Sequence, residues 1–218
     1  MIAHVVERAR ATPGVSQVLV ATDDARIAAA VRAHGGDAVM TREDHASGTD
    51  RLAEVAASLD CDLVVNVQGD EPLIAPSMIA TAIAACAADA SLPIATLRRA
   101  IASLDDYLSP HVVKVVVGAR DRALYFSRAP IPCARDGAAT AVPAAAWQHV
   151  GLYVYRRDAL LRLASLPPSP LERVEALEQL RALEHGFSIR AVETHEDSIG
   201  VDTPDDLERA RARLALTR

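Results

Sequence analysis

Two acidic segments, far apart in the sequence, carry the residue types of a metal–phosphate site. Residues 66–72 read Asn-Val-Gln-Gly-Asp-Glu-Pro and follow an apolar run, so Asp70 comes directly after an expected strand. Asp202 precedes Thr203 and a proline, which are typical of a helix start. Mg²⁺ is commonly held by one or two carboxylates together with phosphate oxygens. Asp70 and Asp202 would form such a clamp if they meet; the alternative is that both belong to ordinary polar turns.

A third segment has the residue types of an anion or nucleotide site. Ser47, Gly48 and Thr49 stand at the expected start of a helix, and Arg42 and Arg51 flank them. The free N–H groups of a helix start can bind polar or anionic ligand atoms. An ordinary serine N-cap with surface arginines explains the tripeptide equally well.

Two further segments bring polar side chains onto one face of an expected element. An amphipathic helix over Leu171–Leu183 would place Glu175 beside Glu178 and Gln179, although carboxylates on the solvated side of a helix are common. A strand around His149 would place that residue and Tyr153 on one side, where both can equally be half-buried residues without a ligand.

Alternating strands and helices must position these side chains in the first half of the chain. The repeating pattern predicts a doubly wound α/β sheet, with ligands at the carboxyl ends of its strands. We expect helices over Ile2–Ala11, Ala25–His34 with Asp23 as its cap, Ser47–Leu59 and Ser77–Ala88, and strands over Gln17–Thr22, Asp37–Met40 and Asp62–Val67. The last of these strands is continuously apolar, as strands of parallel sheets are.

The second half has strands with few helices between them, which predicts a mixed sheet with an antiparallel excursion. We expect strands over Ile94–Arg98, Val112–Gly118, Ala123–Ser127, Val150–Arg156 and Ser188–Val192, a surface loop over residues 136–146, and a final helix that ends near Leu216.

Composition excludes several classes of protein. The chain of 218 residues is 50% hydrophobic with a net charge of −6, which excludes a disordered chain. A pI of about 5.6 argues against a nucleic-acid partner. Cys61, Cys86 and Cys133 lack CxxC spacing, which argues against disulfides and zinc and favours a reducing compartment. Because no apolar run has membrane-spanning length and no signal peptide is visible, we expect a cytoplasmic protein without a membrane partner.

The segments together resemble one enzyme family. Their order and spacing are similar to those of the 3-deoxy-D-manno-octulosonate (Kdo) cytidylyltransferases, or CMP-Kdo synthetases. The matching stretches are TREDHASGTDRLAEV, VVNVQGDEPLI, HVVKVV, ALYFSRAPIP, HVGLYVYRRDAL, PSPLERVEALEQLR and GVDTPDDLERAR, which lie between Met1 and Arg213.

The resemblance implies a fold and a reaction. The fold is α/β and nucleotide-diphospho-sugar transferase-like, with a mixed, mainly parallel sheet flanked by helices and a small antiparallel excursion. One domain would span residues 1–218, with the sugar-binding and dimerisation excursion in residues 90–165. The reaction is transfer of a cytidylyl group from CTP to Kdo with Mg²⁺, giving CMP-Kdo and pyrophosphate for lipopolysaccharide biosynthesis, in a cytoplasmic homodimer.

The resemblance also implies roles for single residues. Mg²⁺ and catalysis fall to Asp70 and Asp202. The residues implied to face the nucleotide are Arg42, Ser47, Gly48, Thr49, Arg51 and Gln68, and those implied to approach Kdo are Lys114, Arg128, His149, Tyr153, Glu178 and Gln179. The alternatives are a cytidylyltransferase for another sugar acid, or a protein that binds nucleotide or sugar acid without catalysis.

One departure from the family pattern concerns the beginning of the chain. Family members begin with a strand, expected at the centre of the sheet, and with a loop whose Arg, Ser and Lys cradle the triphosphate. This chain begins at a later helix, MIAHVVERA, and the sequence offers a misplaced start codon or a genuinely shortened protein as explanations. In both cases we expect the activity of this chain to be impaired or absent, because cations at the triphosphate stabilise the transition state.

Overall fold

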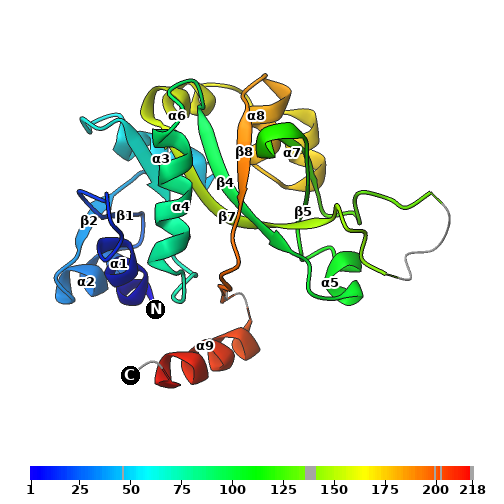
Figure 1. The fold of residues 1–218 in the computed structure, drawn as a ribbon. Helices are drawn as coiled ribbons and strands as arrows, with labels where there is room; N and C mark the ends of the chain where they lie inside the picture. Colours follow the sequence, from blue (N-terminus) through cyan, green and yellow to red (C-terminus); the bar gives the residue numbers. More distant parts are fainter. Residues whose placement is uncertain (46, 136–140, 199, 202, 217–218) are drawn as a thin grey trace.

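Helices and strands alternate along the first half of the chain, as the sequence predicts (Figure 1). The computed structural model describes residues 1–45, 47–135, 141–198, 200–201 and 203–216. The helices are α1 (Ile2–Arg10), α2 (Ala25–Ala33), α3 (Gly48–Ala56), α4 (Pro76–Ala87), α5 (Leu104–Leu108), a 3₁₀ turn (Ala119–Asp121), α6 (Arg157–Ala164), α7 (Pro170–Glu175), α8 (Gln179–Glu184) and α9 (Pro204–Leu216). The strands are β1 (Leu19–Thr22), β2 (Asp37–Met40), β3 (Leu63–Asn66), β4 (Ile94–Ala100), β5 (Lys114–Val117), β6 (Ala123–Ser127), β7 (Trp147–Arg156) and β8 (Ile189–Glu193).

The strands form two sheets. β1 and β2 pair in parallel as a small sheet, while the larger sheet has the order β6-β5-β7-β4-β8 with β3 paired to β7. Strand β7 runs antiparallel to β3, β4 and β5, whereas β4 and β8 are parallel. The fold is therefore the expected α/β arrangement with a mixed sheet, but the expectation of mainly parallel pairing is wrong, because among the described strands only β1–β2 and β4–β8 pair in parallel. The prediction of parallel neighbours for β3 is wrong, because an apolar run indicates burial on both faces and leaves the direction of the neighbour open.

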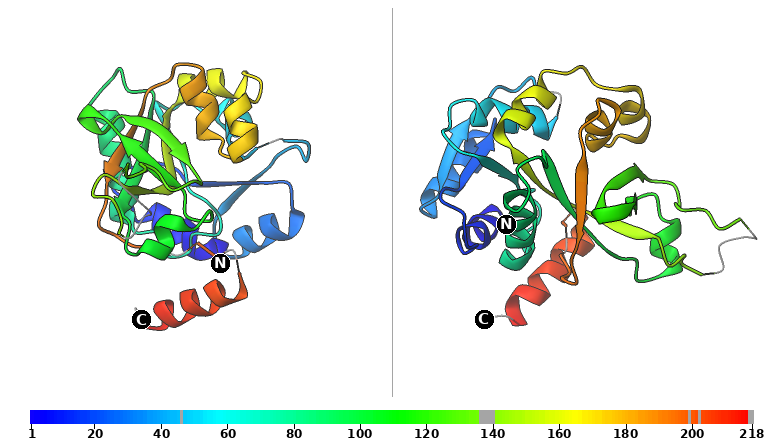
Figure 2. Two further views of the ribbon diagram at one scale, coloured as in Figure 1. Left: turned by 90° about the vertical axis from the view of Figure 1, so that its right-hand side faces the viewer. Right: turned by 45° about the horizontal axis from the view of Figure 1, so that its top comes forward.

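Helices cover both faces of the larger sheet and create two apolar cores (Figures 1 and 2). One core joins α1 and α4 to the sheet and includes Ile79 and Leu97. The other joins α3 and α6 to the opposite face and includes Phe126 and Leu160. Side chains of β3 alternate between the two cores: Val64 packs in the second core, and its neighbours on either side pack in the first.

A cavity of about 550 Å³ separates the two sheets. Its lining includes all residues of β1 and β3, together with residues of α1 and α4 on one side and α3 on the other. Among the described residues, no strand pairs with the edge of β1 that faces away from β2, or with the edge of β3 that faces away from β7. We call this cavity the β1–β3 slot.

The helix predicted over Leu171–Leu183 is wrong in one respect, because it is two helices. α7 ends at Glu175, the next residue Ala176 has a left-handed φ of 52°, and α8 begins at Gln179. Glu175 and Glu178 therefore do not share a helix face. The break fits the polar contacts of the two helices, described below, which an amphipathic pattern does not encode.

Smaller differences also come from tertiary contacts. Asp24 rather than Asp23 caps α2, by accepting a hydrogen bond of 2.7 Å from the amide of Arg26. The helices α5 and α6 were not predicted. The last helix, α9, lies below the body of the molecule in Figure 1 and reaches it through a small apolar cluster around Leu73 and Ala210. Within the part of the chain that the structure describes, no helix has the length and apolar character needed to cross a membrane.

Candidate active site

The carboxyl ends of β1, β2 and β3 bring together three residues predicted to face a nucleotide. Gly48, Arg51 and Gln68 all line one end of the β1–β3 slot. Arg51 Nη2 donates to Asp23 Oδ2 at 2.6 Å, and its Nη1 donates to Thr41 Oγ1 at 2.5 Å. The side chain of Arg51 therefore ties helix α3 to the ends of β1 and β2, and it places a fixed positive charge there.

The beginning of α3 is occupied by a carboxylate from a distant part of the chain. Ser47 caps the helix by accepting a hydrogen bond from the amide of Asp50. The amide of Thr49 donates to Glu178 Oε2 at 3.1 Å, its hydroxyl donates to the same oxygen at 2.6 Å, and the amide of Gly48 donates to Glu178 Oε1 at 3.3 Å. The start of α3 therefore binds an anionic group, as the free N–H groups of a helix start can, while its predicted contact with nucleotide stays a prediction. Its occupant here is Glu178, one of the residues predicted to approach the sugar.

Asp70 lies on the turn after β3, against the segment that leads to α9. The backbone carbonyl of Asp70 accepts a hydrogen bond of 2.9 Å from the amide of Val201, and the hydroxyl of Ser198 donates to the carboxylate of the neighbouring Glu71. Asp202 itself lies outside the described residues. The structure thus places the residue before Asp202 in direct contact with Asp70, although the two are remote in sequence.

His149 and Tyr153 lie side by side on β7, as their alternate spacing predicts. Their ring centroids are 5.4 Å apart, and the His149 ring also meets Phe126 edge-on at 5.0 Å. His149 Nε2 is 3.0 Å from Thr96 Oγ1. Burial lowers the pKa of His149 to about 3 and raises the pKa of Tyr153, so both side chains are neutral near pH 7.

The side chain of Lys114 is enclosed by the protein and bound by backbone carbonyls. Its side chain is fully buried, and Nζ donates to the backbone carbonyls of Ser109, Val112 and Arg128 at 2.6–2.7 Å. A lysine ammonium has three hydrogens to donate, so these three bonds use all of them. Burial lowers the pKa of Lys114, and Glu175 opposes that shift. This structure therefore does not present Lys114 to a substrate, in contrast to the role that the family resemblance implies.

Arg128 is held by the end of α7. Its Nε donates to the carbonyl of Glu175 at 2.9 Å, and its Nη1 donates to the carbonyl of Pro110 at 3.1 Å. The Glu175 carboxylate in turn accepts from the Arg128 amide and from the Ser127 hydroxyl. Burial alone raises the pKa of Glu175, but these hydrogen bonds outweigh it and leave the pKa below its ordinary value. Lys114 and Arg128 form a cluster with each other, and among the described residues neither makes a hydrogen bond or ion pair with the start of α3.

A buried ion network supports Glu178 and Gln179, and sequence reasoning missed it. Arg181 is 3% exposed; its Nη2 donates to Glu172 Oε1 at 2.6 Å, and its Nη1 donates to Asp50 in α3 at 3.2 Å. This network fixes α8 against α3. Gln179 is buried beside it, and its Nε2 has no hydrogen-bond partner among the described residues. The only signal in the sequence was the charge pattern of the α7–α8 region.

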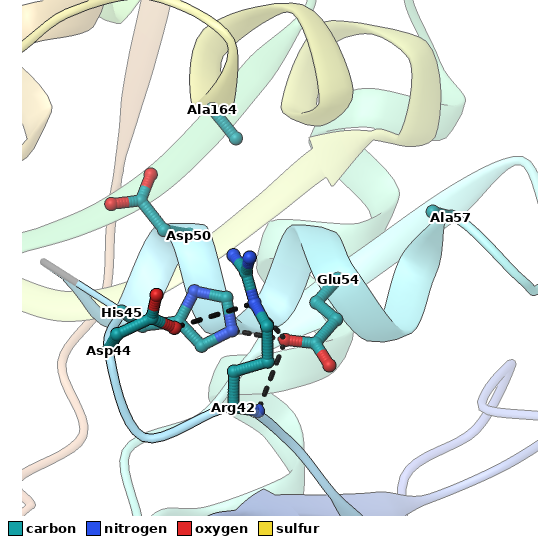
Figure 3. A pocket seen from close by; sticks show the side chains of 7 residues that line it. All are labelled: Arg42, Asp44, His45, Asp50, Glu54, Ala57 and Ala164. Atoms are coloured by element: carbon teal, nitrogen blue, oxygen red, sulfur yellow. Dashed lines mark hydrogen bonds and ion pairs between the residues drawn. The ribbon is translucent and has the colours of Figure 1, made fainter.

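The side chain of Arg42 points away from the other residues predicted to bind nucleotide, although its backbone carbonyl accepts a hydrogen bond of 3.4 Å from Arg51 Nη1. Figure 3 shows it in a second pocket, of about 480 Å³, beside the outer face of α3. Its guanidinium is 3.5 Å from Asp44 and 3.7 Å from Glu54, and the ring of His45 also contacts Glu54. The contact from His45 lowers the pKa of Glu54. The structure does not bring the Arg42 side chain into the β1–β3 slot.

The carboxylate of Asp70 suits a hard cation that takes few protein ligands. Among the described residues, no group of three His, Cys, Asp or Glu side chains could hold a metal ion. Mg²⁺ does not require such a cage, because it commonly takes one or two carboxylates and completes its shell with phosphates and water. The carboxylate of Asp70, on a turn at the carboxyl end of a strand, fits that requirement.

The fold and this arrangement define the class of protein, a nucleotidyltransferase-like α/β protein. The family model described as cytidylyltransferase matches residues 1–194. A solved glucose-1-phosphate thymidylyltransferase from Bacillus anthracis shares the fold, with a TM-score of 0.64 at 13% identity. The match covers 97% of this chain and 80% of the chain of that structure.

More similar proteins identify the family. A 3-deoxy-manno-octulosonate cytidylyltransferase from Geobacter metallireducens is 55% identical over 99% of this chain and 87% of its own length, and one from Syntrophotalea carbinolica is 54% identical over 98% and 88%. A solved CMP:2-keto-3-deoxy-manno-octonic acid synthetase in complex with CTP has a TM-score of 0.92 at 48% identity and covers 100% of this chain, which covers 88% of that structure. This chain belongs to the 3-deoxy-manno-octulosonate cytidylyltransferase family.

Proposed function

We propose that this protein transfers the cytidylyl group of CTP to 3-deoxy-manno-octulosonate and releases pyrophosphate. In this reaction a hydroxyl oxygen of the sugar acid bonds to the α-phosphorus of CTP. The bond from that phosphorus to the pyrophosphate oxygen breaks, and the hydroxyl proton is released. The observation that carries the proposal is the 55% identity to a named 3-deoxy-manno-octulosonate cytidylyltransferase over nearly the whole chain. The product belongs to lipopolysaccharide biosynthesis.

The positions of the polar residues support this reaction. Arg51 provides a fixed cation at the carboxyl ends of β1 and β2, beside Gly48 and Gln68, where CTP would bind. The neutral His149 and Tyr153 suit hydroxyl groups of a sugar better than its carboxylate. Glu178 links the two sides of the site, because it belongs to the α7–α8 region and is bound to the start of α3. Such an enzyme works by orienting its two substrates rather than by forming a covalent intermediate.

Asp70 and Asp202 would hold Mg²⁺ in this proposal. When bound, the ion supplies positive charge that offsets the charge developing on the phosphates. Asp70 supports the assignment through its carboxylate at the end of β3 and its contact with Val201, the residue before Asp202.

We also propose a cytoplasmic homodimer. The free thiols of Cys61, Cys86 and Cys133 are compatible with a reducing compartment. Leu124 lies exposed on β6, a strand at the edge of the larger sheet, where a second copy could pair with it. Light scattering coupled to size-exclusion chromatography should give about twice the chain mass of 23.1 kDa. A mass equal to one chain would contradict the dimer.

Product analysis tests the reaction. The purified chain is incubated with CTP, Mg²⁺ and Kdo, and CMP-Kdo is detected by anion-exchange chromatography and phosphorus NMR. We expect CMP-Kdo above the enzyme-free background and no ester with N-acetylneuraminate. An ester formed with N-acetylneuraminate alone would overturn the sugar assignment. Stabilisation by CTP without any product would overturn catalysis.

A variant pair tests the role of Asp70. Asp70→Asn removes the charge with little change in size, and we expect a loss of turnover of at least about 100-fold, as for other preorganised electrostatic groups. Asp105→Asn changes an exposed aspartate in α5 and should leave the rate unchanged. Far-UV circular dichroism checks that both variants fold. Near-normal turnover of Asp70→Asn would refute the assignment.

A further inference from the structure

A bulge in β7 lies beside His149 and faces Thr96 of the neighbouring strand β4. Thr96 lies opposite Tyr153, and the next residue of β4, Leu97, lies opposite Val150. Two residues of β7, at positions 151 and 152, therefore have no opposite residue in β4. Such bulges re-aim side chains and are common beside functional sites. Thr96 is fully buried, so its hydroxyl must find its hydrogen-bond partners within the protein.

Three polar atoms lie around the Thr96 hydroxyl, which has a single hydrogen. Oγ1 is 2.7 Å from the carbonyl oxygen of Leu152, 3.2 Å from that of Val150 and 3.0 Å from His149 Nε2. A carbonyl oxygen only accepts, so the shortest of these contacts requires the hydroxyl hydrogen. If that hydrogen pointed to His149 instead, two oxygens would face each other at 2.7 Å without a hydrogen between them. The contact with His149 must therefore take its hydrogen from the histidine ring.

The tautomer of His149 follows from this count of hydrogens. Nε2 carries a hydrogen and donates it to a lone pair of Thr96 Oγ1. Burial lowers the pKa of His149 to about 3, so the ring is neutral near pH 7 and has one N–H only. Its other nitrogen, Nδ1, therefore has a lone pair and no hydrogen. In histidines generally, the hydrogen bond of one ring nitrogen sets the state of the other.

Nδ1 is the ring nitrogen that a ligand can reach. Among the described residues, none makes a hydrogen bond to Nδ1, and the enclosed side-chain atoms that lack a partner are Arg98 Nε and Gln179 Nε2. Solvent therefore reaches Nδ1, while Phe126 and Tyr153 pack against the ring. A lone pair at this position accepts a hydrogen bond from a hydroxyl group, whereas it repels the oxygens of a carboxylate or a phosphate, which carry no hydrogen.

We propose that Thr96 is a positioning residue that fixes His149 in the Nε2–H tautomer, so that Nδ1 accepts a hydrogen bond from a hydroxyl group of the ligand. The site then binds a polyhydroxylated acid through a hydroxyl hydrogen at this position and holds the carboxylate elsewhere. The identity of the ligand rests on the proposed function, whereas the tautomer rests only on the contacts of Thr96. The two parts are therefore tested separately.

Nitrogen NMR tests the tautomer in the free protein. The rings of the seven histidines are labelled with ¹⁵N, and long-range ¹H–¹⁵N correlation spectra at pH 7 show which ring nitrogen carries the proton. The signals of His149 are identified by their absence in His149→Gln. We expect a protonated Nε2 and an unprotonated Nδ1. A protonated Nδ1, or the mixture of tautomers that an imidazole free in water shows, would overturn the proposal.

Two substitutions test the part of Thr96. Thr96→Val keeps the branched shape and removes the acceptor, and we expect the ratio of the Nε2–H to the Nδ1–H form to fall by at least about tenfold, because a buried N–H without a partner is unfavourable. Thr96→Ser keeps the hydroxyl and should retain the wild-type signals. If circular dichroism shows that Thr96→Val is unfolded, Thr96→Ala takes its place. An unchanged ratio in the variant without a hydroxyl would refute the role of Thr96.

A second buried threonine provides the matched control. Thr12 is 3% exposed, and its hydroxyl donates to the carbonyl of Arg8 at 3.1 Å. Thr12→Val therefore removes a comparable hydrogen bond away from β4 and β7, and it should leave the His149 signals unchanged. A shift of the tautomer in Thr12→Val as large as in Thr96→Val would show that a general loss of stability, rather than the Thr96 hydroxyl, causes the change.

Titration with Kdo tests the ligand. We expect Kdo to move the Nδ1 signal of His149 in the direction of an accepted hydrogen bond and to leave the proton on Nε2. Transfer of the proton to Nδ1, or binding of Kdo that changes other signals but not Nδ1, would overturn Nδ1 as the acceptor. If Kdo changes no signal of the protein, the sugar of the proposed function is wrong and the ligand part fails with it, while the spectra of the free protein still decide the tautomer.

Discussion

His149 lies among apolar neighbours that change its titration. Its ring contacts Phe126 and Tyr153, and burial lowers its pKa to about 3. Lys114 illustrates the same influence of surroundings, because three carbonyls bind its ammonium and its role becomes structural. At the scale of residues, the environment thus decides whether a side chain with catalytic potential is charged, neutral or already fully bonded.

The low pKa of His149 predicts acid sensitivity. The folded protein holds the ring neutral, while the unfolded chain binds a proton below the ordinary pKa of about 6.5. This contribution is fully present above pH 6.5 and is lost as the pH falls towards about 3, by up to about 1.4 kcal/mol per pH unit. Urea unfolding at pH 7 and pH 5 should show a smaller loss of stability in His149→Gln than in the wild type. His195→Gln, at a residue whose side chain is 92% exposed, should match the wild type. The same loss in His149→Gln as in the wild type would contradict the prediction.

At the scale of elements, the break between α7 and α8 is the largest difference between the predicted and the observed structure. Ala176 has a left-handed φ of 52°, which turns the chain so that Glu175 faces Arg128 while Glu178 faces α3. A capping box of Ser169 and Glu172 starts α7, and Arg181 pairs with Glu172 from α8. These contacts replace the continuous helix that the amphipathic pattern predicts.

Glycine at position 176 should stabilise the protein. A left-handed conformation is unfavourable for alanine and costs glycine little, so we expect Ala176→Gly to raise the free energy of unfolding by about 0.5–1 kcal/mol. The matched control is Ala85→Gly inside α4, which should lower it by about 1 kcal/mol. Urea unfolding measures both changes. A loss of stability in Ala176→Gly as large as that in the control would show that glycine does not relieve the strain of the left-handed conformation.

We expect the ion pairs of Arg181 to contribute most of the stability with which α8 is held against α3 and α7. Arg181→Met leaves the buried carboxylate of Glu172 without its cation, and we expect a loss of about 3–5 kcal/mol in the free energy of unfolding. Arg173→Met, at an exposed arginine of α7, should change it by less than about 0.5 kcal/mol. The double variant Arg181→Met/Glu172→Met should recover part of the loss. Equal effects of the two single variants would argue against the network.

At the scale of the whole molecule, the β1–β3 slot separates the small sheet from the larger one. The larger sheet is buried at its centre, where Ala95 and Leu97 of β4 have no more than 1% exposure, whereas all residues of β1 and β3 except Thr22 and Val64 are partly exposed. Local opening is easiest where few apolar contacts and solvated backbone groups meet. We therefore expect uneven stability, lower at β1 and β3 beside the candidate nucleotide site than at the centre of the larger sheet.

Amide exchange should follow this unevenness. We expect amides of β1 and β3 on the slot edges to exchange at least about tenfold faster than those of Ala95 and Leu97. Exchange measured by NMR in D₂O reports each amide separately, and the amides of β7, which has partners on both edges, serve as the internal control. Uniform protection across β1, β3 and β4 would contradict the picture of an interrupted sheet.

The sequence by itself determined the elements and several local features. Apolar period and turn residues located most helices and strands to within a few residues, because these signals are local. The residues also predicted three features that are confirmed: the serine cap of α3, the adjacency of His149 and Tyr153 on one strand, and the family.

Only the tertiary structure decided how distant residues meet. It joined Glu178 to the start of α3, brought Val201 against Asp70, turned the Arg42 side chain into a second pocket, and enclosed the Lys114 ammonium in three carbonyls. It also set the direction of β3 against β7 and left the β1–β3 slot between two sheets. The physical reason is that burial and pairing depend on neighbours from remote parts of the chain, which a period along the sequence does not record.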